Sequence, residues 1–118
     1  MTKITFFRRD GAFYGFRETG HADYSAAGDD ILCAALSAMT MLIVNASEVT
    51  YASSVDYEID EDKAIITVWA YGALLDREPD ESKRFAVSGL VEAYYYQLND
   101  MLEDYYDYLD VSVQDDDE

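Results

Sequence analysis

The sequence KITFFRRDGAFYGFRET, residues 3–19, contains two runs rich in aromatic residues and other β-formers on either side of Asp10-Gly11. An Asp-Gly pair is a strong signal for a two-residue β-turn, because both turn residues must take positive φ angles. The flanking runs, 3–9 and 12–19, have the composition of β-strands. We therefore predict that the chain begins with an antiparallel hairpin.

A helix is predicted to follow the hairpin, from Asp29 or Asp30 to Asn45. Asp29 or Asp30 is suited to cap its N-terminus, and Gly28 allows the backbone to turn just before it. Apolar residues surround nearly the whole helix, which is typical of a buried helix. They are Ile31, Leu32, Leu36, Met39, Leu42 and Ile43.

The second half of the sequence repeats this order of strands and helix. Strands are predicted over about 54–59 and 64–71, joined by the polar turn 60–63. Pro79-Asp80 marks the start of a second helix. Its apolar residues recur with the spacing of a core-facing stripe: Val87, Leu90, Val91, Tyr94, Leu98, Met101, Leu102 and Tyr105. A short strand over about 108–113 ends the pattern.

The predicted order is ββαββαβ, which indicates an α+β fold with a mainly antiparallel five-stranded sheet packed with two helices. At 118 residues the chain is the size of one compact domain, and we assign residues 1–113 to that domain. The last residues, 114–118, are acidic and are predicted to form a solvated, disordered tail.

Several tyrosines in and after the second helix lie off its apolar stripe: Tyr95, Tyr96, Tyr106 and Tyr108. One interpretation is ordinary packing at a wide interface with the sheet. The other is a contact between two copies of the chain, because exposed aromatic patches often mark interfaces. On the second interpretation we predict a homodimer.

The formal net charge is −17, and every charged residue after Arg84 is acidic. Such a surface repels nucleic acid, so direct binding of DNA or RNA is not expected. It attracts basic partners and speeds their encounter with the protein. Acidity that only keeps the protein soluble explains the charge equally well.

The sequence has one cysteine and no signal-peptide pattern at its N-terminus. Its longest apolar run, 34–44, is too short to span a bilayer, so no membrane association is expected. One cysteine cannot form an internal disulfide, which fits a reducing compartment. We therefore expect a cytoplasmic protein.

The single histidine and the single cysteine, His21 and Cys33, lie at the two ends of one segment. His21 follows the second predicted strand, 22–28 form a loop, and Cys33 falls in the first turn of the first predicted helix. Unpaired N–H groups and the helix dipole favour a thiolate there, and the same groups can hold an oxyanion. His21 is the imidazole base that could activate the thiol. The segment therefore predicts a cysteine nucleophile with its base.

Each of these residues also has a structural explanation. A cysteine in an alanine-rich helix is most often a small core residue, and a histidine at a strand end is usually a surface or hydrogen-bonded residue. Redox sensing by Cys33 lacks a second, resolving cysteine. No metal site or cofactor is expected, because one histidine and one cysteine with Asp23, Asp29 and Asp30 do not make the usual zinc ligand set.

The segments GHA (20–22) and DILCAALSA (30–38), with Gly28 between them, resemble the ribosomal-processing cysteine protease family Prp. Chain length and element order agree throughout, and the second half is similar in pattern. The resemblance implies a cytoplasmic bacterial endopeptidase that forms homodimers. Such enzymes remove a short N-terminal extension from a large-subunit ribosomal protein (number twenty-seven), cutting after paired aromatic residues.

The resemblance assigns the family's catalytic histidine and cysteine to His21 and Cys33, and its conserved aspartate to Asp30. Asp30 would either orient the imidazole or only cap the helix. One turn after Cys33, Ser37 would hydrogen-bond near the site or satisfy a backbone carbonyl.

Two glycines, Gly20 and Gly28, would act as hinges of the loop between the second strand and the first helix. Stronger acidity and a longer tyrosine-rich C-terminal region distinguish this chain from the family. The alternative function is a non-catalytic acidic module that binds a basic ribosomal partner. A reactive thiol at Cys33 distinguishes the protease from that alternative.

Overall fold

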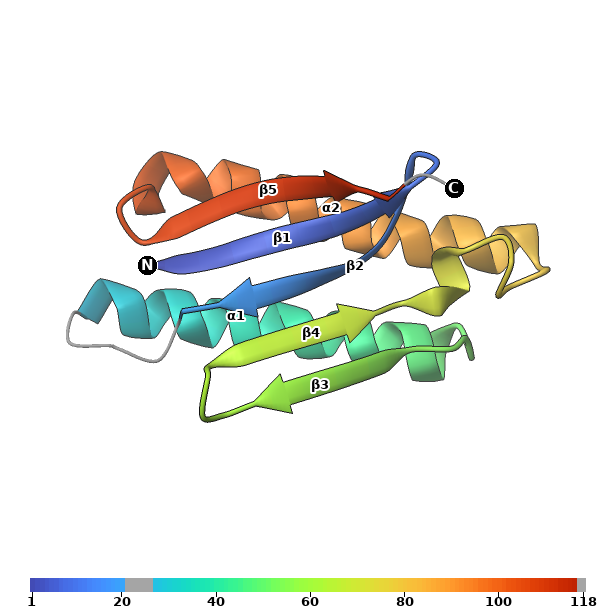
Figure 1. Ribbon diagram of the computed structural model, residues 1–118, viewed down its shortest axis with the longest axis horizontal. Coiled ribbons are helices and arrows are strands. Elements are labelled where there is room, and N and C mark those ends of the chain that lie inside the picture. Colours follow the sequence, from blue (N-terminus) through green and yellow to red (C-terminus); the bar gives the residue numbers. More distant parts are fainter. Residues whose placement is uncertain (21–26, 117–118) are drawn as a thin grey trace.

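Five strands form one sheet, and both long helices pack on the same face of it (Figure 1). The computed structural model describes residues 1–20 and 27–116, with the backbone alone for 27–30. The elements in chain order are β1 (Thr2–Arg9), β2 (Ala12–Thr19), α1 (Ala27–Asn45), the π-helix η1 (Ala46–Thr50), β3 (Asp56–Asp60), β4 (Ile65–Trp69), the 3-10 helix η2 (Tyr71–Ala73), α2 (Glu81–Tyr105) and β5 (Leu109–Asp115). The predicted α+β class and the ββαββαβ order are confirmed.

The sheet has the strand order β3-β4-β2-β1-β5 and is antiparallel except at one edge. β1 and β2 form the predicted hairpin, and its turn residues Asp10 and Gly11 have φ angles of 50° and 83°, as a turn of this length requires. β4 pairs antiparallel with both β2 and β3. The chain then crosses through α2 to the far edge, where β5 runs parallel to β1.

The core lies between the sheet and the helices. Its most buried side chains are Ile4, Phe6 and Phe16 from the central strands, Leu32 from α1, and Val87, Val91 and Leu98 from α2. Burial of a side chain of this size contributes about 1.5–3 kcal/mol. Aromatic rings also pack between the sheet and the helices. The ring centroid of Tyr94 on α2 lies 5.0 Å from that of Phe16 on β2.

α2 begins where the sequence predicts. Asp80 is its N-cap, and the carboxylate accepts hydrogen bonds from the backbone N–H groups of Ser82 and Lys83 at 2.9 and 3.4 Å. Half of the predicted stripe is buried, namely Val87, Val91, Tyr94 and Leu98. The other four residues, Leu90, Met101, Leu102 and Tyr105, are half-buried.

The off-stripe tyrosines divide into two groups. Tyr95 and Tyr108 are half-buried against the core, and the ring centroid of Tyr95 lies 5.3 Å from that of Phe6 and 5.1 Å from that of Phe13. Tyr96 and Tyr106 are 61% and 67% exposed. Packing against the core therefore explains Tyr95 and Tyr108, whereas Tyr96 and Tyr106 present their rings to solvent.

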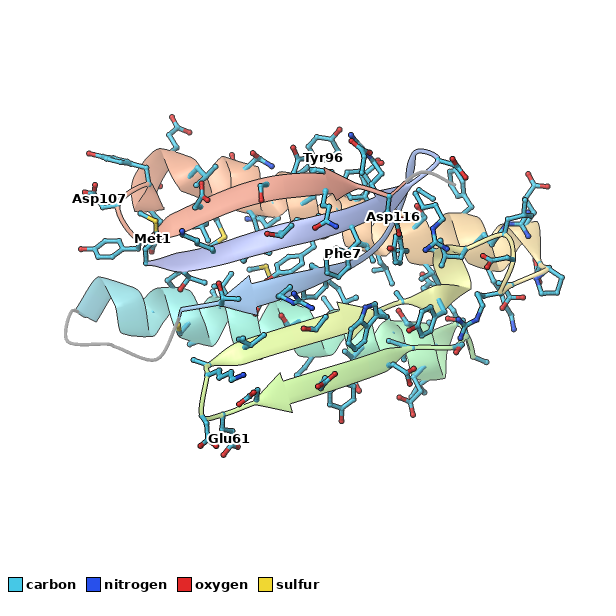
Figure 2. All side chains as sticks on the ribbon, viewed as in Figure 1. Met1, Phe7, Glu61, Tyr96, Asp107 and Asp116 are labelled. Atoms are coloured by element: carbon cyan, nitrogen blue, oxygen red, sulfur yellow. The ribbon has the colours of Figure 1, made fainter. Side chains whose placement is uncertain are left out.

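The acidic C-terminus corrects the predicted boundary at residue 113. β5 continues to Asp115, whose carboxylate accepts hydrogen bonds from the Arg8 guanidinium at 2.6 and 2.8 Å. Asp116 accepts hydrogen bonds from Arg9 at 2.9 Å and from the Tyr14 hydroxyl at 2.6 Å, on the open face of the sheet (Figure 2). Residues 114–116 are therefore held by β1 and β2 rather than forming a disordered tail, because the parallel register places these acids beside two arginines.

The apolar helical segment that contains α1 is longer than the apolar run 34–44 of the sequence. α1 continues into η1, so that 31–50 form one helical stretch of 20 residues with a mean hydropathy of 1.6, which has the length and composition of a membrane-crossing helix. The core helix of a soluble protein meets the same criteria. Only 33% of this stretch is buried inside the fold, so a large part of its apolar surface faces outward.

Candidate active site

Cys33 lies at the boundary between the buried and exposed sides of α1. Its neighbours Leu32 and Leu36 point into the core and are 1% and 3% exposed. Cys33 itself is half-buried, and Ala34 beside it is exposed. The residue is therefore not sealed in the apolar interior, which does not fit the interpretation of Cys33 as a small core residue. Partial exposure is what a reactive cysteine requires.

The start of α1 differs from the prediction. The helix begins at Ala27 rather than at Asp29 or Asp30, so both aspartates lie in its first turn and neither is the N-cap. Cys33 consequently lies in the second turn, and its prediction in the first turn was wrong. Alanine favours helix, and carboxylates are stabilised beside the unpaired N–H groups of a first turn, which explains the earlier start. Those unpaired N–H groups belong to 27–30.

Part of the predicted site lies outside the described residues. His21 and Asp23 belong to 21–26, and only the backbone of Asp30 is described. The pairing of His21 with Cys33 therefore stays a prediction. Gly28 is the second residue of α1, so the prediction that it is a loop hinge was wrong, because the helix takes up the end of the expected loop.

Gly20 ends β2 in a conformation that favours glycine. Its φ angle is 84°, and a Cβ atom at this position would lie 2.5 Å from the carbonyl oxygen of Met1. Its N–H donates a hydrogen bond to the carbonyl of Ala64 at 3.3 Å. Gly20 thus fixes the point where the chain leaves the sheet. This end of β2 and the first turn of α1 lie at the same end of the sheet (Figure 1).

An apolar groove lies between α1 and the outer strands, beside Ser37. Ser37 is exposed and lies one turn after Cys33 on the same side of the helix. The groove has a volume of about 140 Å³ and is lined by Ser37, Thr40, Met41, Val44, Tyr57, Ile59, Ile66 and Val68. It can accept an apolar side chain of a peptide close to Cys33. Sequence reasoning missed it, although Tyr57 and Ile59 alternate with three acids in 56–60, which marks one apolar face.

A buried carboxylate between the two helices was also missed. Glu18 of β2 is 2% exposed. Its Oε1 atom accepts hydrogen bonds from the Thr40 hydroxyl of α1 at 2.9 Å and from the Tyr94 hydroxyl of α2 at 2.6 Å. Two turns separate Thr40 from Cys33 on α1, so this network holds the cysteine-bearing helix to the sheet. The signal in the sequence was a glutamate two residues after Phe16, on the same inward face of β2.

Burial sets the protonation of this network. It disfavours the charged carboxylate and raises the pKa of Glu18 to about 7, while the hydrogen bonds from Tyr94 and Thr40 act in the opposite direction. Burial also raises the pKa of Tyr94 above its ordinary value, so Tyr94 stays a hydrogen-bond donor. Glu18 therefore changes charge in the neutral range, inside the protein.

Comparisons with known proteins agree with the fold and the sequence motif. The family model Peptidase_Prp, described as cysteine protease Prp, matches residues 1–110. The crystal structure of SMU.848 from Streptococcus mutans has a TM-score of 0.79 and 28% sequence identity, covering 98% of this chain and 99% of that chain. No curated protein sequence matches the chain.

Two further structures with this fold contain a peptide. The essential ribosomal processing protease Prp from S. aureus, in complex with a substrate peptide, has a TM-score of 0.77 and 18% identity, covering 97% of this chain and 100% of that chain. The same protease with a covalently linked product peptide has a TM-score of 0.73 and 22% identity, with coverage of 97% and 100%. Because the family model extends over nearly the whole sequence, the chain belongs to the Prp family of cysteine proteases.

Proposed function

We propose that this protein is an endopeptidase that removes a short N-terminal extension from the precursor of a large-subunit ribosomal protein, with Cys33 as its nucleophile. One observation carries the assignment of the nucleophile: a cysteine protease needs a cysteine, and Cys33 is the single cysteine of the chain. Its half-buried position on α1 supports the same role. The ribosomal substrate is supported by the S. aureus relatives, which are ribosomal processing proteases.

The proposed reaction is acyl transfer. His21 accepts the proton of the Cys33 thiol, and the thiolate attacks the carbonyl carbon of the scissile bond. The C–N bond breaks, and the imidazolium of His21 gives its proton to the departing amine. Water then hydrolyses the thioester, which releases the carboxylate product and restores the thiol. The unpaired N–H groups of 27–30 are suited to stabilise the oxyanion.

Two further residues have proposed roles around this dyad. Asp30 lies within the first turn of α1, and its two proposed roles are orientation of the imidazole of His21 and stabilisation of the unpaired N–H groups of that turn. Ser37 lines the apolar groove beside Cys33 and is placed to hydrogen-bond a bound peptide. The groove itself suits the aromatic side chains that precede the cleavage site in substrates of this family. The proposed reaction uses no metal or cofactor.

The test of this function compares wild type with Cys33→Ala on a ribosomal-protein precursor that carries its N-terminal extension. We expect kcat/KM to fall by about 1,000-fold or more in Cys33→Ala, because the nucleophile is gone, with an unchanged thermal unfolding midpoint. Mass spectrometry of the products gives the cleavage position. Normal cleavage by Cys33→Ala would refute the nucleophile, and no cleavage by a folded wild-type enzyme would refute the substrate.

Activation by His21 is tested through the reactivity of the thiol. Because Cys33 is the single thiol, iodoacetamide reports on this site alone. We expect the alkylation rate at neutral pH to fall in His21→Ala towards the rate measured on the urea-unfolded chain, which is the control for an unactivated thiol. Equal rates for wild type and His21→Ala would show that His21 does not activate Cys33.

We also propose that the protein works as a cytoplasmic homodimer, joined through the exposed side of α1. Ile31 and Leu42 are 61% and 63% exposed, and no charged residue occurs in 31–47. Two copies that each carry a net charge of −17 repel one another over most of their surfaces, so an uncharged face is where they can meet. A cytoplasmic location fits the single thiol, because a reducing compartment keeps it active.

Sedimentation equilibrium distinguishes this interface from the tyrosines of α2. We expect Leu42→Asp to convert the dimer into a monomer, because it buries a charge in the apolar contact. Tyr96→Asp, at a similarly exposed position on α2, is the matched control and should leave the dimer intact. If Tyr96→Asp is monomeric and Leu42→Asp is dimeric, the interface lies at the tyrosines of α2 instead. If wild type is monomeric, the homodimer is excluded.

A further inference from the structure

A second and larger groove lies at the opposite end of the molecule from Cys33. It has a volume of about 780 Å³ and lies between the β1–β2 turn, the segment after η2 and the first half of α2. These elements lie at the right of Figure 1, whereas the first turns of α1 lie at the left. The groove is therefore separate from the apolar groove beside Ser37, and the proposed chemistry does not use it.

The groove presents apolar side chains to solvent. Ala73 and Leu74 form its buried part and are each 4% exposed, whereas Leu75 and Phe85 at its edges are 76% and 84% exposed. Two large, exposed apolar side chains that line one concave surface indicate a contact with another molecule. Nothing in the described part of the chain covers Phe85.

A glycine in the middle of α2 supports this conclusion. Gly89 lines the groove one turn after Phe85, and a Cβ atom built there would meet no heavy atom within 4 Å. Glycine weakens the interior of a helix, and no neighbour among the described residues requires it here. Because Gly89 has no side chain, the backbone of a bound segment can lie close to α2. Binding of another molecule therefore explains this glycine, whereas packing within the chain does not.

The charges of the groove select the kind of partner. Four carboxylates line it, those of Asp10, Asp76, Glu81 and Glu92, together with two arginines. Both arginines are directed at oxygens of the chain itself. Arg9 contacts Asp116 at 2.9 Å and Asp76 at 4.0 Å, and Arg84 donates to the carbonyl of Glu78 at 2.6 Å. The groove thus offers excess negative charge on a protein of net charge −17. This disfavours a second copy of the chain and favours a cationic partner.

We infer that this groove is an exosite that binds a cationic segment with a large apolar side chain, carried by the protein that the enzyme processes. The apolar side chain packs between Leu75 and Phe85, its backbone lies against Gly89, and its flanking cations face Glu81 and Glu92. A protein that binds RNA neutralises its phosphates with lysine and arginine, so a ribosomal protein offers cationic segments. The identity of the partner rests on the proposed function, whereas binding of a cationic apolar segment does not.

Direct binding is tested with two blocked pentapeptides, each with a central phenylalanine, one flanked by four lysines and the other by four glutamates. We expect the lysine peptide to shift the backbone amide signals of 85–92 in a saturable way. Its dissociation constant should be at least about tenfold lower than that of the glutamate peptide. Phe85→Ala should weaken binding about tenfold. Tyr96→Ala, exposed on the same helix but outside the groove (Figure 2), is the matched control and should change nothing.

Gly89→Gln separates binding from stability. Glutamine favours helix more than glycine, so we expect the thermal midpoint to rise by about 2–4 °C. The same side chain obstructs the groove, so the affinity for the lysine peptide should fall. Unchanged affinity in Gly89→Gln, shifts away from 85–92, or equal binding of both peptides would each overturn the exosite.

Cleavage connects the groove to the substrate. On the full-length precursor, we expect Phe85→Ala to raise KM about tenfold with little change in kcat. On a short peptide that spans only the extension and the cleavage site, Phe85→Ala should match wild type. Equal losses on both substrates would overturn the exosite. If wild type cleaves neither substrate, the proposed function fails, and the peptide-binding result still decides whether the groove binds cations.

Discussion

The two long helices pack on the same face of one sheet, but they differ in what they leave exposed. α2 buries the stripe formed by Val87, Val91, Tyr94 and Leu98. Its outer side carries the exposed acids Asp100, Glu103 and Asp104, together with the exposed Phe85 and Tyr96. α1 and η1 contain no charged residue in 31–47, and only 33% of 31–50 is buried. An outer side that mixes charges with single apolar residues offers a local contact such as the groove at Phe85, whereas a continuous uncharged side leaves a wider apolar surface for another molecule.

This difference separates stability from function in the molecule. α2 acts mainly as the clamp that holds the sheet, since its buried side chains reach β1 and β2. α1 carries Cys33, one wall of the apolar groove and the uncharged face proposed for the dimer. Substitutions on the buried side of α2 should therefore affect unfolding, and substitutions on the outer side of α1 should affect activity and assembly.

The largest expected effect tests this division through leucines on the two helices. Leu98→Ala removes a side chain that is fully buried, so the free energy of unfolding should fall by about 2–5 kcal/mol. Leu42→Ala removes a side chain that is 63% exposed and should change the stability of the monomer by about 0.5 kcal/mol or less. Urea unfolding at low protein concentration measures both. Equal losses would mean that Leu42 is packed as tightly as Leu98, and the outer side of α1 would then not be free for a partner.

An intermediate effect tests the contact between the helices at Glu18. Burial raises its pKa from the ordinary 4.5 to about 7 in the folded state. Between these pH values the folded protein keeps a proton that the unfolded chain releases. This contribution to stability is fully present below the unfolded pKa and is lost as the pH rises through the folded pKa, a decrease of about 3 kcal/mol.

The matched variant for this prediction is Glu18→Gln. Its side-chain oxygen still accepts hydrogen bonds from Thr40 and Tyr94, but it does not titrate. We expect the free energy of unfolding of wild type to decrease between pH 4.5 and 8 because of Glu18, and that of the variant to lack this decrease. The variant should therefore be more stable than wild type at pH 8. Parallel pH profiles for the two proteins would show that Glu18 does not keep its proton in the fold.

Most of the fold could be predicted from local signals. Asp10-Gly11 identified the hairpin, Pro79-Asp80 identified the start of α2, and the apolar spacing of α2 identified its buried side. Errors occurred where tertiary contacts decide the outcome. Residues 114–116 look like an acidic tail, but Arg8 and Arg9 on β1 hold them. Such pairing between the two ends of the chain leaves no periodic signal in the sequence.

The candidate site was predicted less completely, for a related reason. Cys33 was found because it is the single cysteine in a recognisable motif. Its setting in the second turn was missed, because the two adjacent aspartates that follow Gly28 resemble an N-cap. The groove beside Ser37 and the Glu18 network each combine residues from three elements. Their parts are ordinary in the sequence, and only the packing of α1 against the strands brings them together.

The smallest expected effect concerns the start of α2. α2 is capped by Asp80, whose side chain satisfies N–H groups of the first turn. Asp80→Ala should lower the free energy of unfolding by about 1 kcal/mol, and Asp80→Ser, which keeps a capping oxygen, should recover most of it. Because α2 is structural in this comparison, Asp80→Ala should leave kcat/KM on a short peptide unchanged at temperatures where the protein stays folded. A loss of kcat/KM larger than the change in the folded fraction would show that the start of α2 also acts on the site at Cys33, and the separation of the two helices would fail.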